Sequence, residues 1–287
     1  GAGNYLRNIQ ALYLAKGGVN LAIALLGEEG KVEEGNKIVS AWPYSGSLLL
    51  GKGRINLEIT DESGKINVNR LKDKNGKLVR KRVDQLLRLC DLLNEQYHSP
   101  IIGYGIVPAM VDWVDADNKV ESFNFIYREN KGAEEDYYQS LPHPYHCANR
   151  PFDTVGELGL VRGVSAEVLY GKEGIKATEG LAKYVTVYGA GKININTASL
   201  EIIRSLDERI DKTLAQNILD FREVKPFREV SELKEVKGMS AEIYKSVQGS
   251  ITTEKSTFFS VQSEGIVGKS KREIKAVIER DVGIVYW

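Results

Sequence analysis

One twenty-residue pattern occurs twice in this chain, and the repeat limits the folds that the chain can adopt. Residues 151–170 read PFDTVGELGLVRGVSAEVLY, and residues 226–245 read PFREVSELKEVKGMSAEIYK, with ten identical positions and no gap. Each copy follows a near-identical opener, GKINVN at 64–69 and GKININ at 191–196. Because two copies of one supersecondary unit occupy the middle of the 287-residue chain, the residues on either side must form a different structure.

The spacing of apolar residues predicts helices in this middle region and a long helix at the start. Residues 5–26 are rich in Leu and Ala at helical spacing. The Gly17–Gly18 pair would weaken an isolated helix by about 1 kcal/mol per glycine, so this helix needs a partner to pack against. The openers are expected to cap the segments that follow them, through Asn69 in the first copy and Asn196 or Thr197 in the second. Further helices are predicted at 79–97, 107–114, 198–206 and 213–221.

Both ends of the chain switch to the alternating pattern of strands. A polar loop is expected at Glu28–Asn36. The strands are predicted within 48–59, 258–266, 273–282 and 284–287. These patterns predict an α+β fold, in which a long helix covers an antiparallel sheet and a helical domain is inserted between strands. The expected boundaries are 1–66 with 253–287 for the outer domain, and 67–252 for the inserted α-domain; insertion at a surface turn is tolerable because loop-closure cost grows only with the logarithm of length.

Composition excludes several classes of protein. Lys+Arg and Asp+Glu number 39 each, and this balance argues against a dedicated nucleic-acid binder.

No run of 18 or more apolar residues and no signal peptide is visible, so the sequence as given predicts no membrane span. Gly1–Gly3 has the character of a truncation point or a cloning remnant. Cys90 and Cys147 are expected either as two unpaired buried thiols or as one disulfide.

Seven motifs occur in an order that resembles one known family. They are QALYLAKGGVNLA near the start, ITDESGKINVNRL, VDWVDAD, GAEEDYY, HPYHCANRPF, TVGEL and GKININTAS. The chain is similar, from about Leu6 to Val282, to the general secretion pathway protein K family, the large minor pseudopilin of type II secretion systems. The segment HPYHCANRPF departs from the expected pattern at His143, His146 and Cys147, and the tail is short.

The resemblance carries several expectations. It implies a pseudopilin fold with an inserted α-domain, and an N-terminal inner-membrane helix that is absent from the sequence given. It places this domain in the periplasm, as a non-enzymatic subunit at the tip of the pseudopilus. The expected partners are the minor pseudopilins I and J, together with the major pseudopilin and secreted substrates; no nucleic acid is expected. The resemblance also implies calcium in the α-domain.

Acidic residues concentrate in the first copy of the repeat. Carboxylates that converge with backbone carbonyls suit Ca²⁺, which takes six to eight oxygen ligands; Mg²⁺ is less suited to so many flexible ligands. The segment from Asp115 begins like an EF-hand loop but lacks the glycine and the final glutamate of that motif. The alternative is a solvated acidic turn, with Arg128 and Arg150 as counter-charges. The predicted ligands of a structural calcium ion are Asp112, Asp115, Asp117, Glu121, Glu134, Glu135 and Asp136.

Zinc binding, DNA binding and catalysis are the alternatives to a calcium site. His143, His146 and Cys147 could hold zinc, although their spacing matches no known zinc framework. The repeat resembles helix-hairpin-helix units that bind DNA, so a membrane-tethered nucleic-acid-binding protein is the alternative function; however, residues 207–211 carry three acids and no glycine, which would repel phosphate. No nucleophile elbow, HExxH, P-loop or dinucleotide fingerprint occurs, and we predict no enzyme.

The first helix carries more apolar residues than one buried stripe requires, so part of it is expected to contact a partner protein. The alternative is that all of these residues pack on the sheet. The predicted partner-binding residues are Leu6, Ile9, Leu12, Tyr13 and Val19.

Overall fold

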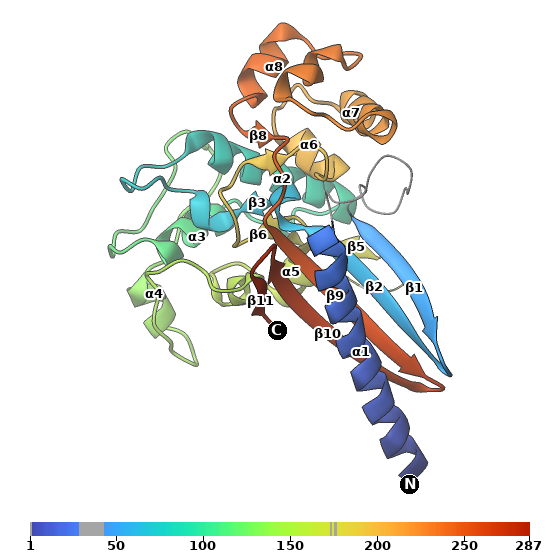
Figure 1. Cartoon of the computed structure of the whole chain (residues 1–287). Coiled ribbons are helices and arrows are strands. Elements are labelled where there is room, and N and C mark those ends of the chain that lie inside the picture. The colour runs from blue at the N-terminus through green and yellow to red at the C-terminus, as the bar shows by residue number, and fades with distance from the viewer. Residues whose placement is uncertain (1, 29–42, 173, 175–176) are drawn as a thin grey trace. The chain divides into compact units, whose positions relative to one another are not determined.

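The structure is a computed structural model, and it describes residues 2–28, 43–172, 174 and 177–287 (Figure 1). The chain divides into two compact units, Gly1–Glu62 with Lys255–Trp287, and Ser63–Glu254. The loop predicted at Glu28–Asn36 falls, after its first residue, outside the described residues.

The first unit is a helix on a five-stranded antiparallel sheet. Its strand order is β1-β2-β9-β10-β11, so β2 and β9 are hydrogen-bonded neighbours although nearly 200 residues separate them in sequence. The predicted α+β fold with an insertion between strands is therefore confirmed. The elements are α1 (Ala2–Glu28), β1 (Tyr44–Leu50), β2 (Gly53–Asp61), β9 (Phe258–Val267), β10 (Ser270–Glu279) and β11 (Gly283–Tyr286).

Helix α1 lies close against the sheet because small residues face each other. Ala11, Ala15 and Ala22 are fully buried. A Cβ at Gly18 would meet the Ser263 Oγ at 2.0 Å, and a Cβ at Gly265 would meet the Ala11 carbonyl oxygen at 1.9 Å. The packing that the Gly17–Gly18 pair required is thus supplied by β2 and β9, and glycine is what allows helix and sheet to approach so closely.

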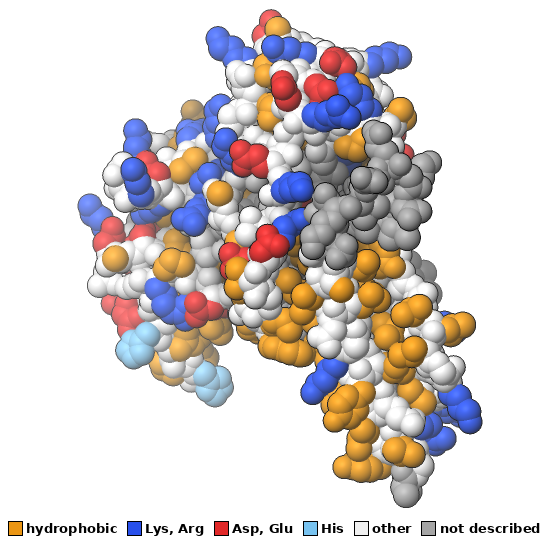
Figure 2. Space-filling model, viewed as in Figure 1, with side chains coloured by type: hydrophobic (Ala, Val, Ile, Leu, Met, Phe, Trp, Pro, Cys, Tyr) orange, Lys and Arg blue, Asp and Glu red, His pale blue; other side chains and the backbone are white. Residues whose placement is uncertain are grey.

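The residues predicted to bind a partner do not share one face of α1. Leu6, Leu12 and Tyr13 are exposed and Ile9 is half-buried, whereas Val19 is fully buried in the core with the sheet. The prediction for Val19 was therefore wrong, because that position faces the sheet. Figure 2 shows the exposed apolar side chains gathered over α1 and the neighbouring hairpin.

The sequence predicted no membrane span, whereas the length and composition of α1 would allow one. Its segment Gly3–Gly27 is long and apolar enough to cross a membrane, and about a third of its most apolar window is buried in this structure. The same helix therefore supplies both a core face and an apolar outer face.

The second unit contains the repeat. Its helices are α2 (Arg80–Tyr97), α3 (Ile106–Val114), α4 (Glu135–Gln139), α5 (Ala166–Tyr170), α6 (Leu200–Ser205), α7 (Lys212–Val224) and α8 (Ala241–Val247). Short 3-10 helices occur at Val68–Arg70, Val155–Leu160, Leu181–Lys183 and Val230–Glu235. Its short strands are β3 (Ile66–Asn67), β4 (Gly171–Lys172), β5 (Thr178–Glu179), β6 (Val185–Thr186), β7 (Ile193–Asn194) and β8 (Ile251–Thr252).

The two openers form strands, so the inserted unit is not all-α as predicted. In the first copy β3 pairs in parallel with β6, and in the second β7 pairs in parallel with β8. Each opener thus meets the chain that follows the last helix of its own copy. These two-residue strands satisfy backbone hydrogen-bonding groups where the chain enters and leaves each copy. They are too short to produce a periodic pattern in the sequence.

The second asparagine of each opener holds the loop that starts with Pro-Phe. The Asn69 side chain donates to the Phe152 carbonyl at 2.9 Å and accepts from the Phe152 N–H at 2.8 Å. Asn196 makes the same two bonds to Phe227, at 2.9 and 2.8 Å. The predicted capping role for Asn69 and Asn196 was wrong. In the first copy Asn67 caps the 3-10 helix Val68–Arg70, and in the second Ser199 caps helix α6.

Other positions that match between the copies also have matching roles. Ser165 and Ser240 cap α5 and α8, each by accepting a bond from a backbone N–H three residues later, both at 3.2 Å. Gly163 and Gly238 both have positive φ, 83° and 92°, a conformation that favours glycine. The sequence identity between the copies therefore records repeated backbone chemistry.

The long segment 116–150 is held by aromatic packing. Trp113 packs edge-on against Tyr138 and is stacked on Phe152 at 6.2 Å between ring centroids. Cys90 and Cys147 are both free and buried, so the disulfide alternative does not hold.

Candidate metal centre

The acidic cluster forms where α3 ends and the long segment folds back over it. Asp112 lies in the last turn of α3 and is fully buried. Asp115 follows the helix as its C-cap residue, and Asp117 lies two residues beyond. Glu134 immediately precedes α4, so the fold of segment 116–150 returns it to the end of α3.

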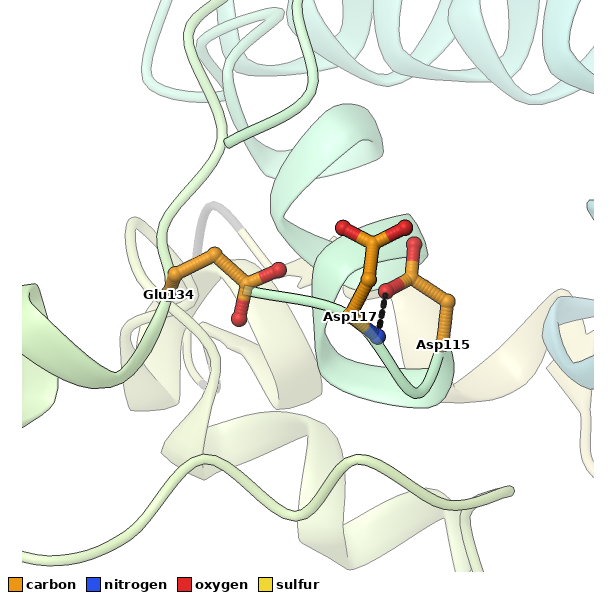
Figure 3. A group of neighbouring side chains, drawn as sticks. All are labelled: Asp115, Asp117 and Glu134. Carbon is orange, nitrogen blue, oxygen red and sulfur yellow. Dashed lines mark hydrogen bonds between the residues drawn. The ribbon is translucent and has the colours of Figure 1, made fainter. Parts of the chain in front are cut away.

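Three of the predicted ligands come together. One carboxylate oxygen from each of Asp115, Asp117 and Glu134 lies within 4.8 Å of the other two, and this is the one such group of His, Cys, Asp or Glu found among the described residues. Figure 3 shows Glu134 reaching toward the two aspartates from the opposite segment. The Asp117 N–H donates to Asp115 Oδ1 at 3.3 Å, which fixes the turn that presents both side chains (Figure 3).

Buried carboxylate oxygens without hydrogen bonds surround this cluster. Both oxygens of Glu134 and the Oδ2 of Asp112 are buried and make no hydrogen bond of ordinary geometry. The Cys147 thiol near Glu134 and the Ala133 backbone near Asp112 only partly offset the burial of these carboxylates. The other oxygen of Asp112 accepts from the Glu121 N–H at 2.9 Å. Burial and the nearby Glu134 raise the pKa of Asp112 to about 7. Burial and the nearby Asp115 raise the pKa of Glu134 to about 7 as well. Such groups are costly to bury in the ionised form unless a cation compensates them.

Gly132 determines how closely the returning segment approaches α3. A Cβ at this position would meet Asp112 Oδ2 at 2.1 Å and the backbone of Pro108 at 3.0 Å. Glycine therefore allows Glu134, two residues later, to reach the end of α3. The signal in the sequence is the Gly-Ala pair immediately before the acidic run.

Lys72 is a member of the site that sequence reasoning missed. Its Nζ donates to Asp115 Oδ2 at 2.5 Å and lies 3.9 Å from Glu121 Oε2. Burial alone would lower the pKa of Lys72, but the bond to Asp115 and the surrounding acids raise it overall. One lysine leaves the cluster with excess negative charge, and nothing near position 72 in the sequence indicates this contact.

Of the seven predicted ligands, four lie outside the group of three. Asp112 and Glu121 lie beside it, joined by the bond from the Glu121 N–H to Asp112, whereas Glu135 and Asp136 point away. Glu135 accepts from the Cys147 N–H at 2.8 Å and pairs with His146 Nδ1 at 2.6 Å, and these bonds lower the pKa of Glu135. Asp136 is exposed within α4. The chain turns into α4 at Glu135, so adjacent acids point in different directions.

The zinc alternative finds no geometry in the part of the chain that the structure describes. Cys147 is buried with its Sγ 3.8 Å from the Asp112 carbonyl oxygen, and His146 is engaged with Glu135.

The predicted counter-charges were also wrong. Arg128 lies over the Tyr104 ring, and Arg150 pairs with Asp153 and Glu157.

The donor set suits a hard divalent cation. Carboxylates from Asp115, Asp117 and Glu134 provide oxygen ligands at a site that is open to solvent at Asp117. This arrangement fits Ca²⁺ better than Mg²⁺, which requires near-ideal octahedral geometry, or Zn²⁺, whose protein sites usually contain nitrogen or sulfur. The orphaned oxygens of Asp112 and Glu134 are the structural observation that supports the fit.

Comparisons with known proteins agree with this architecture. A family model described as type II secretion system protein K matches residues 64–189, and a helix-hairpin-helix motif matches residues 189–252. Type II secretion system protein K of Pseudomonas aeruginosa is 30% identical over 228 residues, which is 76% of this chain and 62% of that protein. The protein of the same name from Pectobacterium carotovorum is 30% identical over 202 residues, covering 68% of this chain and 56% of the relative.

A solved structure is similar over nearly the whole chain. It is a chain of the crystal structure of the GspK-GspI-GspJ complex from the enterotoxigenic Escherichia coli type 2 secretion system, with a TM-score of 0.70, 21% identity, and coverage of 96% of this chain and 94% of that one. At this identity the likeness concerns the fold, whereas the curated relatives, of whose length the chain spans about three fifths, carry the family. The resemblance seen in the sequence, to the type II secretion system protein K family, is confirmed by these comparisons.

Proposed function

We propose that this protein is a minor pseudopilin at the tip of a type II secretion pseudopilus, where it serves protein secretion as a non-enzymatic subunit. The observation that carries the proposal is the pseudopilin-like unit, with a long helix on an antiparallel sheet, interrupted by the domain that matches the protein K family. The partners that we propose are the minor pseudopilins I and J, since a chain of similar fold is part of a GspK-GspI-GspJ complex. The major pseudopilin and secreted substrates are further proposed partners.

The exposed face of α1 supports a contact with such partners. Leu6, Leu12 and Tyr13 expose 56%, 37% and 68% of their surface, and they form an apolar face at one end of the helix. Apolar helix faces of this kind are commonly buried between subunits. We place the protein at the inner membrane with this domain in the periplasm, because α1 is long and apolar enough to continue into a membrane.

Mixing the chain with pseudopilins I and J tests the assembly. Multi-angle light scattering is expected to show one species with the summed mass. A Leu6→Ser/Tyr13→Ser variant is expected to weaken assembly, while the matched surface change Val224→Ser, at a 90% exposed position of the other unit, is not. Separate species for the unaltered chain would refute the proposed partnership.

We also propose that Asp115, Asp117 and Glu134 bind a structural Ca²⁺ ion. When bound, the ion would compensate the excess negative charge and hold segment 116–150 against the end of α3. Calcium is expected to raise the thermal midpoint, because a ligand that binds only the folded state stabilises it by RT ln(1 + [L]/Kd). Asp112, with one orphaned oxygen, would support the site from the helix side.

Two variants separate ligation from general acidity. Asp117→Asn is expected to lose most of the calcium-induced rise in midpoint, because it removes a charged ligand at an exposed position. Asp136→Asn removes an equally exposed acid that lies outside the cluster, and it is expected to keep the full rise. An equal rise in midpoint for the two variants, or no response of the unaltered chain to calcium, would refute the proposed calcium site.

The nucleic-acid alternative is not favoured, although a helix-hairpin-helix motif matches residues 189–252. At the first hairpin of this region Asp207 binds Arg209 through two bonds of 2.8 Å, so the arginine is already engaged by a carboxylate. A gel shift that weakens with salt would revive the alternative.

A further inference from the structure

Strand β1 ends, next to the turn of the β1–β2 hairpin, in three consecutive exposed leucines. Leu48, Leu49 and Leu50 expose 47%, 73% and 57% of their surface. Leu48 pairs with Ile55 and Leu50 with Gly53, so these two leucines share the face of the sheet that carries α1, whereas Leu49 points to the opposite face. Apolar side chains therefore stand on both sides of one strand end, and a single protein surface packed on one face of the sheet would not cover them all.

The neighbouring hairpin ends at the same place. Gly53 of β2 pairs with Val267 of β9, so the turn at Gly51–Lys52 lies beside the turn at Gly268–Lys269. Both turns flank the early part of α1. A Cβ at Gly53 would meet Leu14 at 2.3 Å, and a Cβ at Gly268 would meet Arg7 at 3.5 Å.

Helix α1 leaves the sheet in the direction in which both hairpins point (Figure 1). No described side chain from Gly3 to Gln10 is fully buried. Four residues of helix rise about 6 Å, so Gly3–Leu6, which precede Arg7 beside the Gly268 turn, extend past that turn. A helix that enters a bilayer along this line would bring both turns to the bilayer surface.

The charges around these turns are strongly one-sided. Within residues 3–16, 48–56 and 264–271 six residues are cationic and one is acidic, although the whole chain is neutral. The acid, Glu264, pairs with Lys271 and so does not offset the other cations. The cationic residues are Arg7, Lys16, Lys52, Arg54, Lys269 and Lys271.

We propose that the two hairpin turns, with Leu48–Leu50 as apolar anchors and Lys52 and Lys269 as cationic contacts, bind the surface of an anionic lipid bilayer. Apolar residues buried 5–10 Å in the headgroup region with cations beside anionic lipids are the chemistry of interfacial anchors. Figure 2 shows the same combination, with apolar side chains over α1 and the hairpin and Lys or Arg side chains at the edge. The contact orients the helix-and-sheet unit on the membrane. It does not depend on the proposed role in secretion.

Sedimentation with vesicles tests the proposal. The chain is expected to bind vesicles of phosphatidylethanolamine and phosphatidylglycerol more tightly than vesicles of phosphatidylcholine, and added salt is expected to weaken the binding. Lys52→Glu/Lys269→Glu and Leu48→Ser/Leu49→Ser/Leu50→Ser are each expected to weaken it about tenfold or more. The matched control Lys237→Glu/Lys245→Glu changes two exposed lysines of the other unit and is expected to leave binding unchanged.

A dye reports where the leucines go. Nitrobenzoxadiazole on Leu49→Cys is expected to brighten and shift to the blue with anionic vesicles, whereas the same dye on Val224→Cys is not; the native thiols are buried and do not compete for label. Equal vesicle binding by all variants would overturn the proposal. A Leu49 dye that responds to pseudopilins I and J, or to a second copy of the chain, and not to vesicles would assign the surface to a protein and overturn it too. Variants that lose vesicle binding but still assemble with I and J separate this proposal from the secretion role.

Discussion

The asparagine at the end of each opener joins two distant segments with two hydrogen bonds. Asn69 and Asn196 each satisfy the N–H and the carbonyl of a Phe that lies 83 or 31 residues later. An asparagine after a short apolar run has the sequence character of a cap, and the local pattern contains no information about a loop so far away. The repeat itself was visible in the sequence, whereas the partner of its asparagine depended on the fold.

Removing one of these side chains is expected to destabilise the second copy. Asn196→Ala leaves the N–H and the carbonyl of Phe227 without their partner and is expected to lower the free energy of unfolding by about 2–3 kcal/mol. Gln216→Ala, which removes an exposed bond to Asp220, is expected to cost less than about 1 kcal/mol. Urea denaturation measures both, and equal costs would show that the Asn196 bonds contribute no special stability.

The carboxylate cluster was predictable only where its members are neighbours in sequence. Asp115 and Asp117 lie two residues apart on a turn, so their spacing alone predicted a shared site. Glu134 and Glu135 were predicted together, from composition. Helix α4 begins between them, and Glu134 joins the cluster whereas Glu135, the first residue of α4, does not. Lys72 carried no local signal, because the whole of α2 and α3 lies between it and Asp115.

The stability of the metal-free chain is expected to rise as pH falls from 8 to 5. The folded pKa values of Asp112 and Glu134 are raised to about 7, above their ordinary values of 3.8 and 4.5. Their ionisation therefore penalises the folded state above pH 7, and the penalty disappears as pH falls toward the unfolded values. Denaturation in the presence of a chelator measures the trend. Asp112→Asn/Glu134→Gln is expected to flatten it, and an unchanged slope in that variant would assign the trend to other groups.

At the scale of elements, periodicity predicted the long helices and most strands of the sheet, because each buries one face. Strand β1 was not distinguished from β2, because most of its residues are exposed. The parallel pairs β3–β6 and β7–β8 were not predicted, since two residues cannot display a period. The predicted pair of glycines in α1 proved to have unequal roles. Gly18 lies against Ser263, whereas the nearest atom to a Cβ at Gly17 is 3.9 Å away.

Alanine at these adjacent glycines is expected to have effects of opposite sign. Gly17→Ala gains helix propensity without a clash and is expected to stabilise the fold by about 0.5–1 kcal/mol. Gly18→Ala forces α1 away from Ser263 and Ile55 and is expected to destabilise it by about 1–3 kcal/mol. Thermal midpoints of the two variants check the pair, and a stabilising Gly18→Ala would show that the helix has room to shift.

At the scale of the molecule, the sequence predicted an insertion between strands because strand patterns flank a repeated helical region. The structure divides the chain into two units, each with its own apolar core. The core of Ser63–Glu254 is the larger and contains both copies of the repeat. The proposed calcium ligands all belong to this unit, so the ion acts on one core.

Scanning calorimetry is expected to resolve two transitions, of which calcium moves one. The proposed ion binds only Ser63–Glu254, so the transition of that unit is expected to shift to higher temperature while the transition of the helix-and-sheet unit stays in place. The Gly18→Ala variant identifies the second transition, because it alters only the contact between α1 and the sheet. A single transition that moves as a whole would mean that the two cores unfold together.

The pairing of β2 with β9 has a mechanical consequence. The inserted residues leave the sheet at the end of β2 and return at the start of β9, and these two strands are hydrogen-bonded along Gly53–Asp61 and Phe259–Val267. A pulling force applied to the two ends of the chain is therefore carried across this ladder before any tension reaches residues 63–254. The inserted unit is shielded from load for as long as the ladder holds, so the part of the chain with the acidic cluster can keep its shape while the helix and sheet bear the strain.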